Sequence, residues 1–259
     1  MNKTIKQIAY KIRELTPPGI KKRIGLIGDF FSYPKYPSLK PTLEYLKNWG
    51  FNPSVAVDIG ASGGEWTRAF KGIFPSAKVL MVEAQEKMAL RLQEVCKDYS
   101  GEVFYEVALL GATDDAQVVF AEAGFGSSIF EENSTYARHH VQKSLTRLDS
   151  LLSRHLDFQK IDFLKLDVQG YELEVLKGAA EVAQSAEFVL MEASLIPINK
   201  GCPLFSGVLE FMEKINFRLL DFCSQYRRKD GALWQTDLLF IKNDSKFIPA
   251  ATLNSENWA

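Results

Sequence analysis

The clearest chemical signal in this sequence is a glycine-rich loop after Asp58, together with a second acid, Glu83, 25 positions after Asp58. Asp58 lies near the end of a short apolar run, and Gly60, Ala61 and Gly63 follow within five residues. Glycines here allow a sharp turn, so that a ligand can approach backbone N–H groups at the start of a helix. Glu83 ends the next apolar run, and an ionised carboxylate can accept hydrogen bonds from two ribose hydroxyls. The loop and the two acids predict a nucleoside-binding site.

The spacing of the glycines disfavours two common nucleotide sites. A dinucleotide fingerprint would need glycine at positions 60, 62 and 65, but Ser62 and Glu65 occupy the last two. The Gly-Lys-Ser/Thr sequence of a phosphate-binding P-loop is also missing after the loop. Asp58 would repel a pyrophosphate and attract an ammonium or sulfonium group. We therefore expect S-adenosylmethionine, a nucleoside with a positive charge and no phosphate, with a simple tight strand–helix connection as the alternative.

Further acids stand near the ends of apolar runs later in the chain. Asp167 and Glu192 each end such a run, and Asp237 precedes the last one. Ligands of open α/β sheets bind at the carboxyl ends of strands, so these acids could face a ligand. Glu172 has the alternative role of a first-turn acid that interacts with a helix dipole, and Asp167 could cap the same helix.

These residues need a sheet to bring them together, and the chain from Val55 onward has the pattern of one. Short apolar runs alternate with amphipathic helices, which predicts an α/β fold with a doubly wound, mostly parallel sheet. Helices are expected around 88–96, 171–177 and 205–212. Strands are expected at Val55–Ile59, Val79–Glu83, Val103–Ala108, Phe163–Val168, Phe188–Glu192, Phe217–Phe222 and Leu238–Ile241.

The expected organisation is a helical extension over residues 1–50 that packs on a single domain over residues 51–259. A second helix of the extension could begin at a Ser38 cap, with Pro41 in its first turn. Residues 111–154 form a longer stretch with one short apolar run, Val118–Ala121, and are interpreted as a lid or insertion.

Composition and charge restrict the class of protein. The 259 residues have a formal net charge of −1, which argues against a dedicated nucleic-acid-binding protein. The three cysteines, Cys96, Cys202 and Cys223, are odd in number and lack CxxC spacing, as expected for a reducing, cytoplasmic location without a thiolate metal site.

The amino terminus departs from this neutral balance. Residues 1–23 contain seven Lys and Arg and one acid, a local charge of +6, and residues 1–15 have helical apolar spacing. The interrupting lysines argue against a signal peptide or a membrane span. An amphipathic helix on an anionic membrane or a partner protein is one interpretation, and a packed terminal helix with a solvated basic face is the other.

Several segments are together similar to a known family. The stretch Leu164–Ala179, with its Lys-x-Asp-Val-x-Gly-x-Glu-x-x-Val-Leu-x-Gly pattern, resembles the FkbM-type methyltransferases, and the similarity covers roughly residues 38 to 242. Other matching segments are Val57–Gly64, Val82-Glu83, Gly126-Ser127-Ser128, Met191-Glu192 and Gln235–Phe240. The chain departs from the family at Gln169, where glutamate is usual, and at Ala84, where proline is usual.

The resemblance implies an S-adenosylmethionine-dependent O-methyltransferase of the Rossmann-like class I fold, with a sugar or glycan as acceptor. It also implies that Ser127 and Ser128 contact the cofactor or the acceptor, with a flexible turn as the alternative. Ala108, which ends the third expected strand, and Asp167 complete the expected cofactor site. Alternatives are O-methylation of a lipid, polyketide or other natural product, and a non-catalytic partner in glycan assembly.

Methyl transfer from a sulfonium to a hydroxyl needs the three reacting atoms in line, and it needs a group that takes the hydroxyl proton. Asp167 and Glu192 are the best placed acids for proton transfer, for binding the hydroxyl, or for holding a hard cation such as Mg²⁺. Glu172 and Asp237 are expected to bind the acceptor. Five aromatic residues could stack on a sugar ring, although each more often has a packing role: Trp66, Phe125, Tyr136, Tyr226 and Trp234.

Overall fold

The computed structural model describes residues 39–134, 137–158 and 160–248. The basic helix expected over residues 1–15, the Ser38 cap and Tyr136 lie outside these ranges. The helix expected after Ser38 is α3 (Leu39–Asn48), which buries Leu43 and Leu46.

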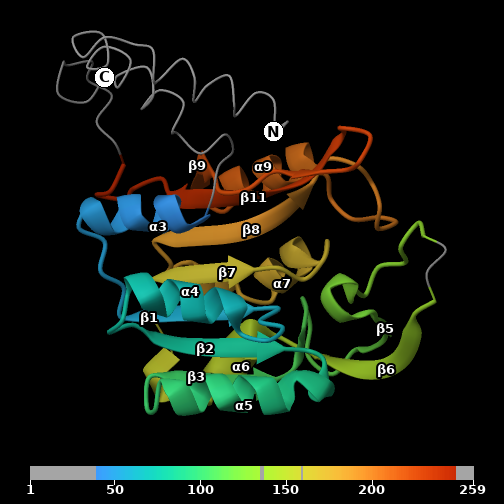
Figure 1. Ribbon diagram of the computed structural model, residues 1–259, viewed down its shortest axis with the longest axis horizontal. Helices are drawn as coiled ribbons and strands as arrows, with labels where there is room; N and C mark the ends of the chain where they lie inside the picture. Colours follow the sequence, from blue (N-terminus) through green and yellow to red (C-terminus); the bar gives the residue numbers. More distant parts are fainter. Residues whose placement is uncertain (1–38, 135–136, 159, 249–259) are drawn as a thin grey trace, which may run out of the picture. The chain divides into compact units, whose positions relative to one another are not determined.

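A mostly parallel eight-stranded sheet forms the centre of the described structure (Figure 1). Its parallel part, in spatial order, is β3 (Val103–Val107), β2 (Lys78–Glu83), β1 (Val55–Ile59), β7 (Phe163–Leu166) and β8 (Phe188–Ser194). Three antiparallel strands extend it beyond β8, namely β11 (Leu233–Lys242), β9 (Phe217–Phe222) and β10 (Tyr226–Arg227). The expected fold class, an α/β fold with a mostly parallel sheet, is confirmed.

The strand order places a topological switch point between β1 and β7. The chain first builds the sheet from β1 through β2 to β3, and it then returns to the other side of β1 with β7 and β8. The connections after β1 and after β7 therefore leave in opposite directions, which opens a crevice at the carboxyl ends of these two strands.

Helices cover both faces of the sheet because successive strand residues point to opposite sides. In β1, Val57 and Ile59 face the core shared with α6 (Leu148–Leu152), α7 (Glu172–Lys177), α8 (Ala180–Ala183) and α9 (Phe205–Lys214). Ala56 faces the second core, with α3, α4 (Glu65–Ile73) and α5 (Ala89–Asp98). Asp58 has the same parity as Ala56 and so points toward α4.

A second, smaller sheet lies beside the carboxyl ends of the parallel strands (Figure 1). It consists of β4 (Leu109–Leu110), β6 (His139–Thr146) and β5 (Gln117–Glu122), with β5 and β6 antiparallel. Three short 3₁₀ helices complete the connections: η1 (Glu86–Met88), η2 (Gly124–Gly126) and η3 (Leu156–Phe158). The stretch interpreted as a lid or insertion thus holds β5, β6 and α6.

Three strand limits differ from the sequence-based expectation in ways that move acidic residues. β7 ends at Leu166, so Asp167 follows the strand, and β8 continues two residues beyond Glu192. β11 begins at Leu233, so Asp237 lies within this strand and not before it. The polar residues at the start of β11 hid the strand, because it pairs with β8 along its length and needs no continuous apolar run.

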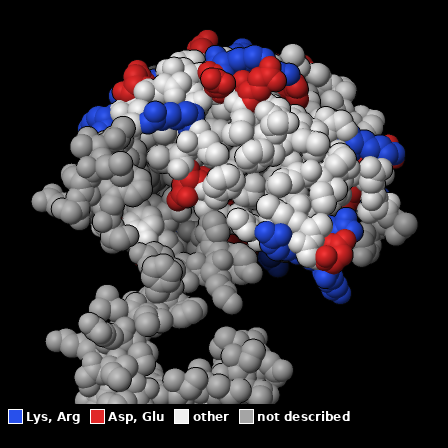
Figure 2. All heavy atoms as spheres, turned by 90° about the horizontal axis from the view of Figure 1, so that it is seen from above, with Lys and Arg blue, Asp and Glu red and all other residues white. Residues whose placement is uncertain are grey.

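The surface of the described residues carries mixed charge. On the face shown in Figure 2, acidic and basic side chains are interspersed around a largely uncharged centre. Within the described residues, no helix is both long and apolar enough to cross a membrane.

Candidate active site

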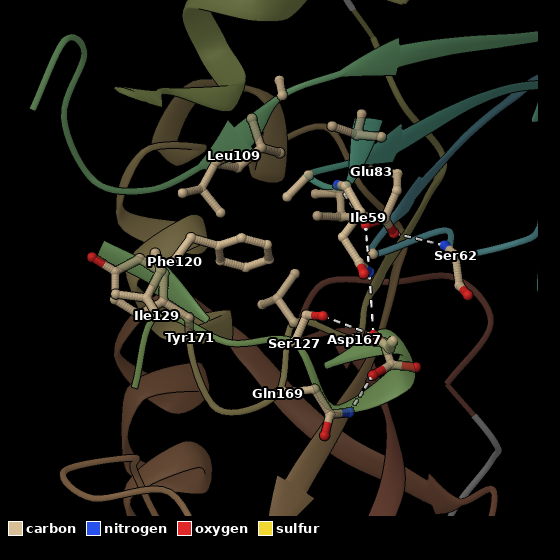
Figure 3. Close-up of a pocket in the computed structure, with 18 residues that line it drawn as sticks. Ile59, Ser62, Glu83, Leu109, Phe120, Ser127, Ile129, Asp167, Gln169 and Tyr171 are labelled. Carbon is tan, nitrogen blue, oxygen red and sulfur yellow. Dashed lines mark hydrogen bonds between the residues drawn. The ribbon is translucent and has the colours of Figure 1, made fainter. Parts of the chain in front are cut away.

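A pocket of about 630 Å³ lies at the switch point between β1 and β7. Its walls come from the carboxyl ends of neighbouring strands, with Ile59 at the end of β1, Glu83 at the end of β2 and Asp167 just after β7. Figure 3 shows Glu83, Ser62 and Asp167 on one side of this space and the apolar side chains of the β5–η2 region on the other. The polar and apolar walls suit a ligand with two chemically different parts.

The turn between β1 and α4 brings its backbone against the next strand connection. Gly60 has φ 72°, and a Cβ on it would lie 1.9 Å from the carbonyl oxygen of Asp167, so only glycine fits. The Gly60 N–H donates to the Val82 carbonyl at 2.9 Å, which ties the turn to β2. Ser62 also adopts a positive φ, 49°.

The carboxylate of Glu83 is held in place by the residues around it. Its Oε2 accepts from the Ser62 N–H at 2.8 Å, and its Oε1 accepts from the N–H and the side-chain amide of Gln85 at 2.9 and 3.1 Å. A carboxylate has about four acceptor sites. Glu83 therefore retains capacity for one further donor in the pocket.

Asp58 does not face the pocket, which differs from the position expected for it. Its carboxylate is fully buried, accepts a hydrogen bond from Thr67 Oγ1 at 2.7 Å, and forms an ion pair with Lys165 Nζ at 3.0 Å. Asp58 and Lys165 are paired residues on the neighbouring parallel strands β1 and β7, so their side chains share one face. The role of Asp58 in the structure is to pair this buried lysine beneath the loop.

Lys165 is the cation at the base of the site. It also donates to the Gly60 carbonyl at 3.0 Å and lies 3.8 Å from Oδ2 of Asp167. Burial alone would lower the pKa of Lys165, but the carboxylates of Asp58 and Asp167 outweigh it and raise the pKa to about 12. The ammonium therefore stays charged and links the loop after β1 to the turn after β7.

Asp167 and Glu192 are bridged by the side-chain amide of Gln169, and this pair of carboxylates extends the site toward β8 and β11. The Gln169 side-chain amide donates to Asp167 Oδ1 at 2.9 Å and lies 3.4 Å from both carboxylate oxygens of Glu192. The Gln235 amide donates to Glu192 from the other side. Glu192 is buried, whereas the Asp167 side chain is 43% exposed. Asp167 is thus the carboxylate of this pair that a ligand can reach.

Asp237 and Tyr226 continue this polar surface on β11 and β10. Asp237 is directly opposite Glu192 in the antiparallel β8–β11 pair. The hydroxyl of Tyr226 donates to Asp237 Oδ2 at 3.3 Å, and 46% of Tyr226 is exposed. An aromatic ring therefore stands at the surface next to the acidic side chains.

Burial and mutual repulsion raise the pKa of several acids here. Burial, followed by the charges of Asp167, Glu172 and Asp237, raises the pKa of Glu192 well above its usual value. Burial also raises the pKa of Asp237. For Tyr226, burial and the charge of Asp237 raise the pKa to about 12, so its hydroxyl stays a donor. The region combines proton acceptors of different strength within a small volume.

Four other residues that were expected to contact a ligand contact other parts of the protein instead. Ala61 is buried in the second core, and the Gly63 N–H donates to Glu65. Ser128 is fully buried, with its hydroxyl donating to the Gln169 carbonyl. Glu172 accepts from the Val168 and Gly170 N–H groups at the start of α7, and burial raises its pKa to about 7. None of these four, nor Asp58, Glu192 or Asp237, is among the described residues that line the pocket.

Five residues expected at the site do line the pocket: Gly60, Glu83, Ala108, Ser127 and Asp167. Sequence reasoning assigned no contact there to Gln85, Phe120, Ile129 or Tyr171, which also line it. Phe120 belongs to the apolar run Val118–Ala121 that was expected within the lid. The sequence therefore marked this residue as apolar but did not indicate that it lines a pocket. Trp66 stacks on Phe70 in the second core, at 4.7 Å between ring centres, and so has a packing role.

The metal expectation finds no matching ligand set. In the parts of the chain that the structure describes, no group of three or more His, Cys, Asp or Glu side chains is arranged to hold a metal ion. Asp167 and Glu192 share the amide of Gln169 instead.

A comparison with protein families gives a match over most of the described structure. A family model described as "Methyltransferase FkbM domain" matches residues 58–219, which span the pocket, Asp167 after β7 and Glu192 in β8. No curated protein matches the sequence.

Solved structures with a similar chain course are distant in sequence. Magnesium protoporphyrin IX methyltransferase from Synechocystis PCC 6803, with bound S-adenosylmethionine, is 10% identical, with 79% of this chain and 77% of that chain covered and a TM-score of 0.47. The 1,6-didemethyltoxoflavin-N1-methyltransferase of Burkholderia thailandensis is 12% identical, covering 89% and 92%, with a TM-score of 0.44. The fibrillarin pre-rRNA processing protein of Methanococcus jannaschii is 14% identical, covering 73% and 66%, with a TM-score of 0.48.

Proposed function

Because this chain belongs to the FkbM methyltransferase family, we propose that it transfers the methyl group of S-adenosylmethionine to a hydroxyl of a saccharide or glycan. When bound, the cofactor supplies an electrophilic methyl group on a sulfonium. The chain itself must bind the cofactor, orient the acceptor hydroxyl and receive its proton. Each of these tasks has a candidate group at the end of the parallel strands.

The pocket fits a cofactor of this kind. Among the described residues that line it, none is Lys, Arg or His, so a phosphorylated ligand would lack a cationic partner. Two of the lining residues carry side-chain oxygens that are buried without a hydrogen-bond partner, Ser62 Oγ and Gln85 Oε1. Buried polar atoms of this kind are normally satisfied, which supports a polar ligand in the space between them.

The two acids of the pocket fit the two ends of the cofactor. Glu83 has acceptor capacity for one ribose hydroxyl on the side of β2, and the apolar residues Leu109 and Phe120 across the pocket suit an adenine ring. Asp167 lies along the same polar wall as Glu83 (Figure 3), where a carboxylate favours the positive end of the ligand. Asp167, and not Asp58 as expected from the sequence, is thus the acid that would attract the ammonium or sulfonium group of the cofactor.

The observation that carries the saccharide acceptor is the exposed ring of Tyr226, whose hydroxyl donates to Asp237. A sugar presents an apolar C–H face and a rim of hydroxyl donors, and it is recognised by an aromatic ring flanked by carboxylate and amide acceptors. The acidic surroundings also disfavour a phosphorylated acceptor at this place. Arg228 at the β10–β11 turn is paired with Asp230, at 2.6 Å.

Asp167 is the group we propose to take the proton of the acceptor hydroxyl. It is exposed in the pocket, and its carboxylate is oriented by the Gln169 amide and the Lys165 ammonium. Glu192 lies behind it and is buried. In this arrangement Glu192 fixes the local charge and the position of the amides, and Asp167 contacts the hydroxyl.

The cofactor assignment predicts a strong effect of Glu83→Gln. Glutamine has one acceptor oxygen in place of two, so its NH₂ group must face either the Ser62 or the Gln85 N–H, and a ribose bond is lost as well. We expect the affinity for S-adenosylmethionine, measured by calorimetry, to fall about 10- to 100-fold, the value of one hydrogen bond to a charged group. Glu86→Gln is the control, because Glu86 is three residues away with a side chain 83% exposed. Equal affinity in wild type and Glu83→Gln would refute the cofactor site.

The acceptor is tested by product profiling with methyl-labelled S-adenosylmethionine and a cell lysate separated into glycan, lipid and small-molecule fractions. We expect label in the glycan fraction, and about two- to tenfold less with Tyr226→Ala, since aromatic contacts contribute about 0.5–1.5 kcal/mol. Tyr226→Phe retains the ring and should retain most activity. Tyr45→Ala, which removes a tyrosine 52% exposed on α3, is the control.

The other outcomes of this experiment identify the rival functions. Label in the lipid or small-molecule fraction would overturn the saccharide and select a lipid or natural-product acceptor. Cofactor binding by calorimetry without label in any fraction would select a non-catalytic binding protein. Localisation in the cytoplasm and a membrane or protein contact of the basic amino terminus stay predictions from the sequence.

A further inference from the structure

The Gln169 side chain is placed between two carboxylates that would otherwise repel each other. One amide nitrogen lies 2.9 Å from Asp167 Oδ1 and 3.4 Å from each carboxylate oxygen of Glu192. A glutamine amide offers two N–H donors, one for each acid, and a glutamate at this position would offer none. The residue type therefore matches the charges around it.

The backbone of Gln169 is held in a conformation that glutamine rarely adopts. Its φ is 56°, and that of the following Gly170 is 99°. A left-handed conformation costs a non-glycine residue about 1–2 kcal/mol, so the surroundings must stabilise it. Two side chains do so, because the Gln169 carbonyl accepts from Ser128 Oγ and from Asn199 Nδ2, both at 2.9 Å.

These two bonds come from separate loops that meet over the residue. Ser128 follows η2, and Asn199 lies between β8 and α9. The loops are joined by backbone hydrogen bonds of 2.7 Å from the Asn133 N–H to the Ile198 carbonyl and from the Lys200 N–H to the Glu131 carbonyl. Three chain segments thus fix the place from which the amide of Gln169 projects.

The wider charge distribution makes an amide important here. Glu192 faces three other acids, which are Asp167 after β7, Glu172 in α7 and Asp237 in β11. Lys165 is the cation that faces Asp167 and Asp237, and it is already paired with Asp58. Gln169 donates to one oxygen of Asp167, and Lys165 lies 3.8 Å from the other. The direction of the Asp167 carboxylate in the pocket therefore depends on Gln169 together with Lys165.

We propose that Gln169 is a positioning residue for methyl transfer, which holds the Asp167 carboxylate in the direction of the acceptor hydroxyl by bridging it to Glu192. This inference rests on the proposed function, and it adds to it a residue that lines the pocket and acts through Asp167. The left-handed backbone, pinned by Ser128 and Asn199, is the device that brings the amide between the acids.

The test compares two variants that separate the amide from the backbone. Gln169→Asn keeps an amide and suits a left-handed backbone, because Asn is the non-glycine residue that tolerates it best, but it is one methylene too short to bridge the acids. Gln169→Met keeps the length and removes both donors without adding a charge. The control is Gln93→Met, the same change at an exposed position of α5.

For both Gln169 variants we expect turnover on the labelled acceptor fraction to fall about 10- to 100-fold, as for a misplaced catalytic group. The affinity for S-adenosylhomocysteine should stay within about threefold and the melting temperature within a few degrees, as for Gln93→Met. Full turnover in Gln169→Asn or Gln169→Met would overturn the proposal. So would a turnover loss matched by an equal loss of S-adenosylhomocysteine affinity, because that would be a structural effect on the pocket.

A spectroscopic readout keeps the proposal independent of activity. In protein with ¹⁵N-labelled glutamine, the Gln169 side-chain amide is identified as the signal missing from Gln169→Asn. We expect its hydrogen exchange to be at least about tenfold slower than that of Gln93, since it is bonded to two carboxylates. An amide that exchanges as fast as Gln93 would overturn the bridge. A protected amide in a wild-type protein that transfers no methyl to any fraction would instead refute the proposed function.

Discussion

Replacing Lys165 by methionine should lower the free energy of unfolding by about 3–5 kcal/mol, the cost of leaving one partner of a buried ion pair alone. Methionine has a similar length and fills the space, so the loss is electrostatic. It leaves the fully buried Asp58 carboxylate with the Thr67 hydroxyl and without its cation. Urea unfolding followed by circular dichroism measures the change.

Two further variants distinguish this mechanism from a simple packing defect. Lys214→Met removes a lysine whose side chain is 69% exposed and paired with Glu210, and it should change stability by less than about 0.5 kcal/mol. In the double variant Asp58→Asn/Lys165→Met both charges are gone, so a large part of the lost stability should return. A double variant no more stable than Lys165→Met would contradict the ion-pair explanation.

Replacing Asp167 by asparagine should lower turnover at saturating S-adenosylmethionine by about 10²- to 10⁴-fold, the usual contribution of a general base. Asparagine retains the oxygen that accepts from Gln169, so the local geometry is kept while the proton acceptor is lost. Labelled transfer to the acceptor fraction measures the change. Asp157→Asn is the control, because this side chain is 60% exposed and pairs with Lys78 far from the pocket. Turnover in Asp167→Asn within threefold of wild type would exclude Asp167 as the base.

Chelation separates the two roles that an acid at this position could have. A carboxylate that takes the proton directly needs no metal, and the described residues show no group of three or more metal-binding side chains. We expect EDTA treatment to leave the transfer rate unchanged. Loss of activity with EDTA and its recovery with Mg²⁺ would assign Asp167 to metal binding instead.

Local patterns were sufficient for the sheet and the loop. Val55–Ile59 and Phe217–Phe222 are strands with the expected limits, because a short apolar run between turn residues has few alternatives in an α/β chain. Gly60 was expected in a tight turn, and the structure shows the reason in the carbonyl of Asp167, 1.9 Å from where a Cβ would lie. Strands whose apolar residues alternate with polar ones were less visible, such as β6 and the first half of β11.

Some residues of the candidate site could also be predicted from local sequence, whereas others depended on contacts with distant parts of the chain. Glu83 and Asp167 were expected to face a ligand because each ends or follows a strand, and both line the pocket. Asp58 was expected there on the same local grounds, but it is paired with Thr67 and Lys165. Glu172 was expected to bind the acceptor, but it accepts from backbone N–H groups at the start of α7. Position relative to a strand end is a local property, whereas the availability of a carboxylate depends on what the fold places beside it.

The sequence by itself determined the α/β class, the glycine turn and the set of acids at the strand ends, since apolar periodicity and glycine conformations act over a few residues. Only the tertiary structure decided which acid a ligand meets. The partner of Asp58 is Lys165, more than one hundred residues later, and the two meet because β1 and β7 are neighbours in one register. Strand order and register are set by packing of the whole chain, so the pairing that buries Asp58 and the bridge that orients Asp167 have no signal in local sequence.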